Sequence, residues 1–183
     1  EGMAAPFPKS YWDRLQAMAE FSAALVDAGG NVPAIGDLDD GHMTRLCDSP
    51  DFHPHLSLVA SMAVLRDRPE LAAKAGSMDE KTYWLTGEAG AGHWAALAGC
   101  ATASGIPKAF PEGGYWWMGR DWETDQEVRL LFDCGPLGFL SLAAHGHADA
   151  LSVQLSVRGR EILTDAGNWC YFQEPVWRDY FKS

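Results

Sequence analysis

The hydrophobic pattern of this 183-residue chain changes its period near residue 105, and this change limits the folds open to it. Apolar residues first recur at helical spacing, which predicts short helices over residues 11–25, 56–65, 70–75, 79–85 and 92–97. After residue 105, apolar and polar residues alternate, most regularly over 151–157. A turn at Arg158–Arg160 then predicts a hairpin that returns to Asp165. Helices followed by strands are typical of an α+β protein or of two separate domains.

Glycine and proline are concentrated between residues 99 and 114, where they mark a boundary between the two patterns. We therefore expect a helical part over 1–104 and an antiparallel β part over 105–183. Further strands are predicted at 115–118 and 127–133.

Composition excludes several classes of function. Hydrophobic residues make up 47 % of the chain and charged residues 21 %, as in globular proteins. The net charge of −11, from 14 basic and 25 acidic residues, argues against nucleic-acid binding and against docking to anionic membranes. No apolar run approaches the ~20 residues of a membrane span, and no secretory signal is visible. The four cysteines match no CxxC metal motif and are expected to be buried thiols.

The stretch His145-Gly146-His147 is the strongest chemical feature. On an extended segment, side chains two residues apart lie on the same side, so both imidazoles and Asp149 would face one site. The predicted hairpin would bring Asp165 beside them. Two histidines and returning carboxylates favour a metal or catalytic site. Hydrogen-bonded core histidines are the alternative. By contrast, the sequence His53-Pro54-His55 is interpreted as a helix N-terminus.

Other candidates have an ordinary structural interpretation beside a functional one. The acidic loop 36–42, which contains Asp39, either forms turns and caps or lines a cleft and contacts substrate. Trp117 is a candidate platform for a sugar ring, with core packing as the alternative. Arg178 offers a guanidinium for an anionic group, or an ion pair with Asp179.

Several motifs resemble those of the heparinase II/III-type polysaccharide lyases, relatives of the oligoalginate lyases. The stretches that carry the resemblance are Pro33–Gly41, Phe110–Tyr115, Phe132–Gly138, His145–Ser152, Leu163–Gly167 and Trp177–Phe181. The resemblance implies the end of an (α/α) toroid followed by the start of an antiparallel β-sandwich. It also implies a carbon–oxygen lyase that cleaves a uronic-acid-containing glycan, heparan sulfate-like or alginate-like, by β-elimination.

The resemblance assigns roles to single residues. His147 and Asp165 match two ligands of a structural Zn²⁺ site, whose third ligand would lie beyond Ser183. His145 matches a histidine of the catalytic cleft. The family's catalytic tyrosine and carboxylate-neutralising residue would precede the chain, so we expect these residues alone to be inactive. Tyr171 and Tyr180 are further candidates for acid–base catalysis.

The expected partner is an acidic polysaccharide, with a homodimer as a possible assembly. The family implies a periplasmic or secreted location. Because the chain is acidic overall, positive charge for the substrate would have to be gathered locally, by Arg120, Arg129, Arg158, Arg160 and Arg178. A non-catalytic carbohydrate-binding or structural protein with a metal-braced sandwich is one alternative. A metal-dependent hydrolase with an open coordination position is the other.

Overall fold

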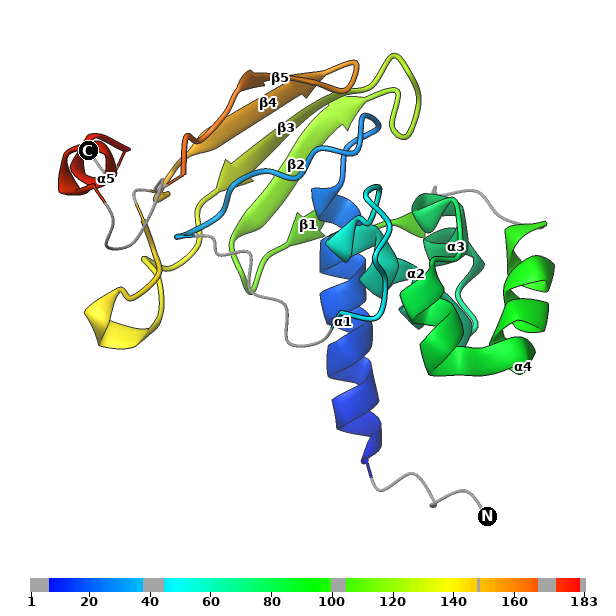
Figure 1. Cartoon of the computed structure of the whole chain (residues 1–183). Coiled ribbons are helices and arrows are strands. Elements are labelled where there is room, and N and C mark those ends of the chain that lie inside the picture. The colour runs from blue at the N-terminus through cyan, green and yellow to red at the C-terminus, as the bar shows by residue number, and fades with distance from the viewer. Residues whose placement is uncertain (1–6, 38–44, 100–104, 148, 168–173, 182–183) are drawn as a thin grey trace. The chain divides into compact units, whose positions relative to one another are not determined.

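The structure is a computed structural model that describes residues 7–37, 45–99, 105–147, 149–167 and 174–181 (Figure 1). The chain forms two compact units, each made of two separate stretches. One comprises Glu1–Ala24 and Thr44–Pro107, and the other comprises Leu25–Met43 and Lys108–Ser183. The predicted division at residue 104 differs in one respect, because residues 25–43 cluster with the strands. None of the described helices is long and apolar enough to cross a membrane.

The first unit is helical, as its sequence predicts. Its elements are α1 (Lys9–Leu25), α2 (Pro54–Arg66), α3 (Pro69–Ala75) and α4 (Glu80–Ala98). His53 caps α2, where its Nδ1 accepts a hydrogen bond from Leu56 N, which confirms the interpretation of that histidine. Asp79 caps α4 in the same way, with Thr82 N as donor. Gly87, at φ 65°, kinks α4 at the point between the two helices predicted there.

The core of this unit is built from small apolar residues. Val59, Ala60 and Ala63 of α2 and Leu71 of α3 are fully buried, which lets the short helices approach closely. Ser61 and Thr82 share a buried hydrogen bond of 2.9 Å between their hydroxyls, so these two hydroxyls satisfy each other.

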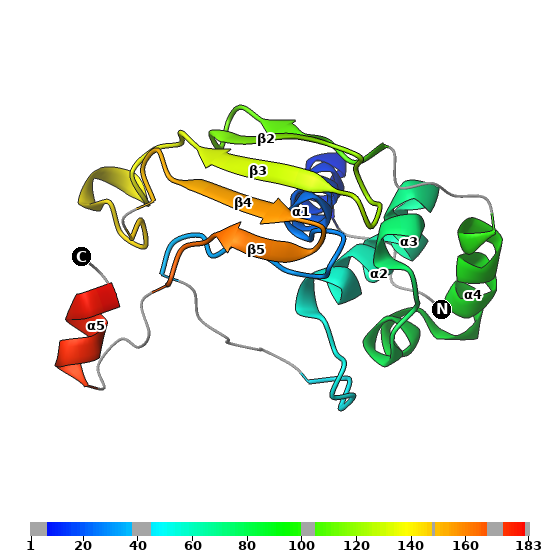
Figure 2. The same ribbon diagram turned by 90° about the horizontal axis from the view of Figure 1, so that it is seen from above.

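The second unit is built on a five-stranded antiparallel sheet, whose strands follow one another in chain order (Figure 2). The strands are β1 (Ala109–Phe110), β2 (Tyr115–Arg120), β3 (Val128–Asp133), β4 (Val153–Val157) and β5 (Arg160–Leu163). The β4–β5 hairpin turns at Arg158–Gly159, which confirms the prediction from the alternating pattern. A short helix, α5 (Pro175–Phe181), lies near the end of the chain.

A segment from Leu25 to Asp37, here called the strap, crosses one face of this sheet. The hydrogen bonds that fasten it include Arg129 Nη1 to Val26 O at 2.7 Å, Asn31 Nδ2 to Gly159 O at 2.9 Å, and Gln154 Nε2 to Ala34 O at 2.6 Å. The strap joins the sheet rather than the helices because buried polar side chains of the strands need its backbone carbonyls as partners.

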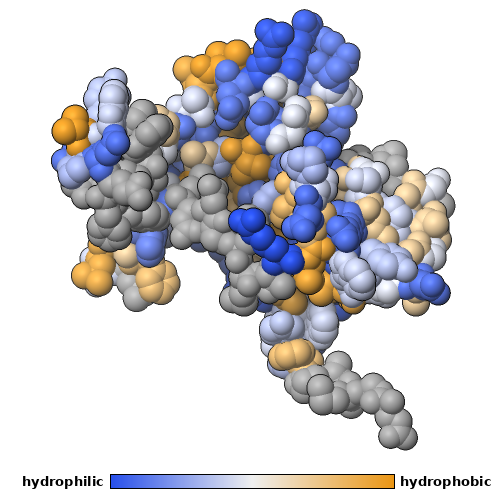
Figure 3. Space-filling view, viewed as in Figure 1, coloured by the Kyte–Doolittle hydropathy of each residue, from blue (hydrophilic) through white to orange (hydrophobic). Residues whose placement is uncertain are grey.

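The two faces of the sheet differ in exposure. On the strap side Trp117, Leu131 and the polar Gln154 are buried. On the opposite side Met118 is 53 % exposed and Val153 is 42 % exposed. The alternation of 151–157 predicts the reverse, with apolar residues inside. On β5, Ile162 and Leu163 are also exposed, and an orange patch lies at the top of Figure 3 near one end of this strand.

Candidate functional site

The loop between β3 and β4 has an unusual backbone. Within nine residues it holds four non-glycine residues at positive φ: Ala143 (49°), His145 (62°), His147 (44°) and Leu151 (63°). L-amino acids rarely adopt this region, and such strain concentrates at functional sites. Gly146 is tightly enclosed, because a Cβ there would lie 2.9 Å from the backbone nitrogen of Gly138. The loop therefore holds a conformation that its sequence does not favour locally.

This backbone separates the two histidines. The His-Gly-His pattern predicts both imidazoles on one side of an extended segment. That prediction is wrong because the residues lie in turns rather than in a strand. The side chain of His145 is 74 % exposed, whereas that of His147 is 6 % exposed. The two rings therefore occupy different environments although one glycine separates them.

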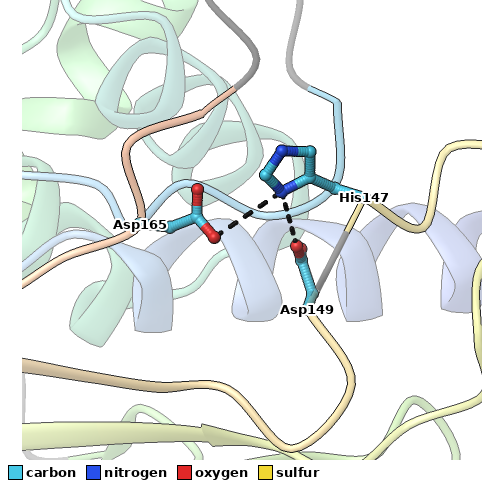
Figure 4. Close-up of side chains that lie close together, drawn as sticks. All are labelled: His147, Asp149 and Asp165. Carbon is cyan, nitrogen blue, oxygen red and sulfur yellow. Dashed lines mark hydrogen bonds and ion pairs between the residues drawn. The ribbon is translucent and has the colours of Figure 1, made fainter. Parts of the chain in front are cut away.

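His147 lies in a buried cluster with two carboxylates (Figure 4). Its Nδ1 is 3.1 Å from Asp149 Oδ1 and 3.6 Å from Asp165 Oδ2. One ligand atom from each of the three residues falls within 4.8 Å of the others. Its Nε2 is buried, with no hydrogen-bond partner among the described residues. The predicted return of Asp165 to the histidine loop is confirmed.

The chemistry of this donor set fits a zinc ion. Imidazole nitrogen and carboxylate oxygen are both ligands of zinc in proteins. A buried imidazole nitrogen without a partner is costly unless something binds it. Asp149 belongs to the cluster as closely as Asp165 does, although the family resemblance matched only His147 and Asp165 to metal ligands. In the sequence, the two-residue spacing between His147 and Asp149 is the signal that indicates Asp149 as a member of the site.

Asp149 also connects the cluster to the strap. Its Oδ2 accepts a hydrogen bond from the backbone N–H of Gly36. Gly36 lies at φ 64°, and a Cβ there would lie 2.5 Å from the carbonyl oxygen of His145. Only glycine allows the strap to approach the loop this closely.

His145 occupies the other side of the loop. Its Nδ1 lies 2.8 Å from Oδ1 of Asp37, the last described residue of the strap. His145 also lines a cavity of about 360 Å³ between the strap and the β3–β4 loop. A cavity of this size is within the usual range for small-molecule sites. An exposed imidazole held at one nitrogen and bordering a cavity is suited to proton transfer.

The cavity is acidic. Glu112, Asp133 and Asp149 line it, and its lining within the described residues includes no lysine or arginine. Tyr115 lies at its wall. Burial raises the pKa of Tyr115, and the carboxylates of Asp133 and Asp149 raise it further. The phenol therefore stays protonated over an extended pH range.

The arginines expected to gather positive charge lie elsewhere. Arg129 is buried against the rings of Trp117 and Trp122, 3.9 Å from Glu127. Burial lowers the pKa of the Arg129 guanidinium, although Glu127 opposes this. A separate cavity is lined by two further arginines, Arg120 and Arg158. None of these three reaches the cavity that His145 lines, because they lie at the opposite end of the strands.

The remaining candidates are not brought to His145 by the described structure. Trp117 is 5 % exposed and packs edge-on against Phe110, with centroids 5.6 Å apart, so it serves as core rather than as an accessible stacking platform. Tyr180 lies on α5, edge-on to Trp177, and does not line the cavity. Arg178 is also on α5, but its side chain lies outside the described residues. So do Asp39 and Tyr171.

Comparisons with known proteins find one matching family model and several similar solved structures. Residues 102–183 match the family model described as "Heparinase II/III-like, C-terminal". Over these residues the chain is similar to the heparinase II/III-like family. No curated protein matches the chain.

Solved structures of heparinase III resemble the whole chain. A heparinase III gene product with methylated lysines matches over 96 % of this chain, with a TM-score of 0.64 and 17 % identity. A second structure of a heparinase III gene product matches over 96 % as well, with a TM-score of 0.56 and 15 % identity. At these identities the likeness supports the fold. The chain spans 23 % of the length of each of these two heparinase III chains.

Proposed function

We propose that this chain is part of a polysaccharide lyase that cleaves a uronic-acid-containing glycan by β-elimination. One observation carries the proposal: His145 presents an exposed imidazole to a cavity, directly beside the buried cluster around His147. Its position within the heparinase II/III-like part of the chain supports this reading.

His145 can supply one of the groups that the proposed reaction requires, the base. The C5 proton of a uronate is weakly acidic, and it becomes more acidic when the adjacent carboxylate is neutralised, because the enolate-like intermediate is then stabilised. A base removes this proton, and an acid protonates the leaving O4 oxygen. His145 is suited to the first step, since Asp37 occupies its Nδ1 and Nε2 remains for the substrate. The product carries a C4–C5 double bond, and no water is consumed.

The group that neutralises the uronate carboxylate must come from elsewhere. The cavity beside His145 is lined by carboxylates, which would repel the uronate carboxylate rather than neutralise it. We propose that residues outside these 183 supply the cationic or amide donor and the principal catalytic tyrosine, which agrees with the 23 % coverage of the heparinase III chains. Tyr171 and Tyr180 remain candidates for the acid, with Arg178 and Asp39 as further substrate contacts.

We also propose that the His147 cluster holds a zinc ion. His147 and Asp165 would be ligands, and either Asp149 or a residue beyond Ser183 would be a third. Such an ion would brace the loop. The burial of the cluster argues against a metal-dependent hydrolase, which needs an open coordination position for water or substrate.

The finer architecture belongs to the same proposal. We infer that the sheet is one layer of an antiparallel β-sandwich and that α1–α4 end an (α/α) toroid. The apolar, exposed face of the sheet that carries Met118 and Val153 supports this, because such a face is expected to pack against a second layer.

A direct assay tests the function. The complete protein is offered heparan sulfate, alginate, hyaluronan and glucuronan, and near-ultraviolet absorbance reports the conjugated double bond. We expect a rise with one of these glycans and none with the His145→Ala variant. His93→Ala is a matched control, because His93 is also a carboxylate-paired histidine, 2.9 Å from Asp67 in the helical unit. No rise with any glycan, in a folded protein, would favour a carbohydrate-binding or structural role.

A further inference from the structure

We propose that Asp37 is the positioning residue for His145, selecting the tautomer in which Nδ1 carries the proton and Nε2 is the free acceptor. One part of this inference rests on the proposed function: the role of Nε2 as the base that removes the uronate C5 proton. A neutral imidazole has one N–H, and the hydrogen bond made by one nitrogen decides which nitrogen carries it. A carboxylate accepts but does not donate, so a carboxylate at Nδ1 holds the proton there.

The distance between the two side chains and the burial of Asp37 support a well-positioned hydrogen bond. The Nδ1–Oδ1 distance is 2.8 Å, and the carboxylate is the better buried partner, with 21 % of the Asp37 side chain exposed. The His93–Asp67 pair of the helical unit is as short, at 2.9 Å, but the Asp67 side chain is 77 % exposed. Exposed pairs of this kind contribute little and fluctuate. The carboxylate of Asp37 is therefore more shielded from solvent than that of Asp67.

The strap fixes the position of Asp37. Its neighbour Gly36 donates its backbone N–H to the buried Asp149 and has no room for a Cβ against His145 O. Two residues earlier, Ala34 O accepts a 2.6 Å hydrogen bond from Gln154. The strap is thus anchored to the sheet and to the loop immediately before Asp37. The same segment that orients His145 also holds, through Asp149, the cluster of His147.

In the acidic loop 36–42, Asp39 is the carboxylate predicted to contact substrate. The structure instead places Asp37 on the histidine. Asp37 does not line the cavity beside His145. We therefore expect it to act through His145 rather than by contact with the glycan.

The test uses the complete protein with ¹⁵N-labelled histidine. Variants Asp37→Asn and Asp37→Ala are compared with the wild-type protein and with Asp67→Asn, and His145→Ala identifies the signals of His145. We expect the wild-type His145 to show the Nδ1–H tautomer and Asp37→Ala to shift it toward Nε2–H. On the glycan that the protein cleaves, we expect kcat to fall by about 10- to 100-fold in both Asp37 variants, with KM little changed. Asp67→Asn should change neither quantity.

Each outcome decides the proposal. An unchanged tautomer in Asp37→Ala overturns it, whatever happens to the rate. A shifted tautomer with wild-type kcat also overturns it, since the positioning would then have no consequence. If wild-type protein cleaves none of the glycans, the lyase function fails, and the tautomer spectra alone decide whether Asp37 orients His145. Asp37→Asn keeps the size of the side chain, so it reports on the contact even if Asp37→Ala folds poorly.

Discussion

The two sides of the β3–β4 loop differ in exposure, and this difference suits the two chemical tasks that we propose for them. His145 faces outward, paired with Asp37 and bordering a cavity. His147 faces inward, enclosed with Asp149 and Asp165. A base must meet its substrate, whereas a structural metal ligand is best removed from solvent. The left-handed backbone between Ala143 and Leu151 makes the separation possible, because a regular strand would direct both rings to one side.

The strap joins these two sides. It reaches His145 through Asp37 and reaches His147 through Gly36 and Asp149. A disturbance confined to one histidine should therefore affect one task, and a disturbance of the strap should affect both.

The largest effect is expected from His145→Ala, which removes the proposed base. We expect kcat to fall by about 10³-fold, within the range that general acid–base groups contribute. Metal content and melting temperature should stay near wild-type values, because the ring is exposed and lies outside the His147 cluster. Kinetics, metal analysis and thermal unfolding on one preparation measure all three. Loss of the metal in this variant would contradict the division of tasks.

His147→Ala should affect zinc binding and stability, which His145→Ala leaves unchanged. Removing the buried imidazole takes away one proposed zinc ligand and leaves Asp149 and Asp165 close together without their partner. We expect loss of bound zinc and a decrease in the free energy of unfolding of about 3 kcal/mol, measured by denaturant titration. A chelator should lower the stability of the wild-type protein but not of this variant. Full zinc occupancy in His147→Ala would show that the ion lies elsewhere.

Gly36→Ala tests the strap. A Cβ there would meet His145 O at 2.5 Å, and the residue lies at φ 64°, so we expect a loss of about 2 kcal/mol in stability. Activity and zinc retention should both decrease, since the strap reaches both histidines. Gly30→Ala is the matched control, because Gly30 is also in the strap at φ 85° but a Cβ there meets nothing within 4 Å. Equal effects in the two variants would mean that backbone strain alone, without the close approach, explains the result.

The smallest effect concerns acid stability. Burial tends to raise the pKa of Asp27, but hydrogen bonds from Asn31 and from the Gly29 N–H outweigh it, so the pKa lies below its ordinary value of 3.8. A lowered pKa stabilises the fold above the unfolded value of 3.8, and this stabilisation is lost as pH falls through the lower folded value. We expect Asp27→Asn to cost about 1 kcal/mol at neutral pH and to flatten the loss of stability below pH 4. Asp13→Asn, on the exposed part of α1, should leave the pH profile unchanged.

The sequence predicted most elements whose signals are local. Helical spacing located α1 to α4, and the short turn at Arg158–Gly159 located the β4–β5 hairpin, because these patterns depend on neighbouring residues. The buried face of β4 was predicted incorrectly. Gln154 is inside because Ala34, 120 residues earlier in the chain, supplies its acceptor, and no pattern within 151–157 can reveal that partner.

The candidate site was predicted in part. His147 and Asp165 are close together as expected. His145 lies apart from them, because the loop turns through positive φ angles at non-glycine residues that the sequence pattern does not reveal. The pairing of Asp37 with His145 joins residues 108 positions apart. Such a pairing appears only when the fold brings the strap to the loop.

The mass of the cleavage product distinguishes β-elimination from hydrolysis. The complete protein digests its glycan in ¹⁸O-labelled water, and mass spectrometry compares the new chain ends with those formed by His145→Ala. We predict products that lack the label and carry an unsaturated uronate, at a rate that collapses in the variant. Incorporation of ¹⁸O into saturated products, or full activity without His145, would contradict the account.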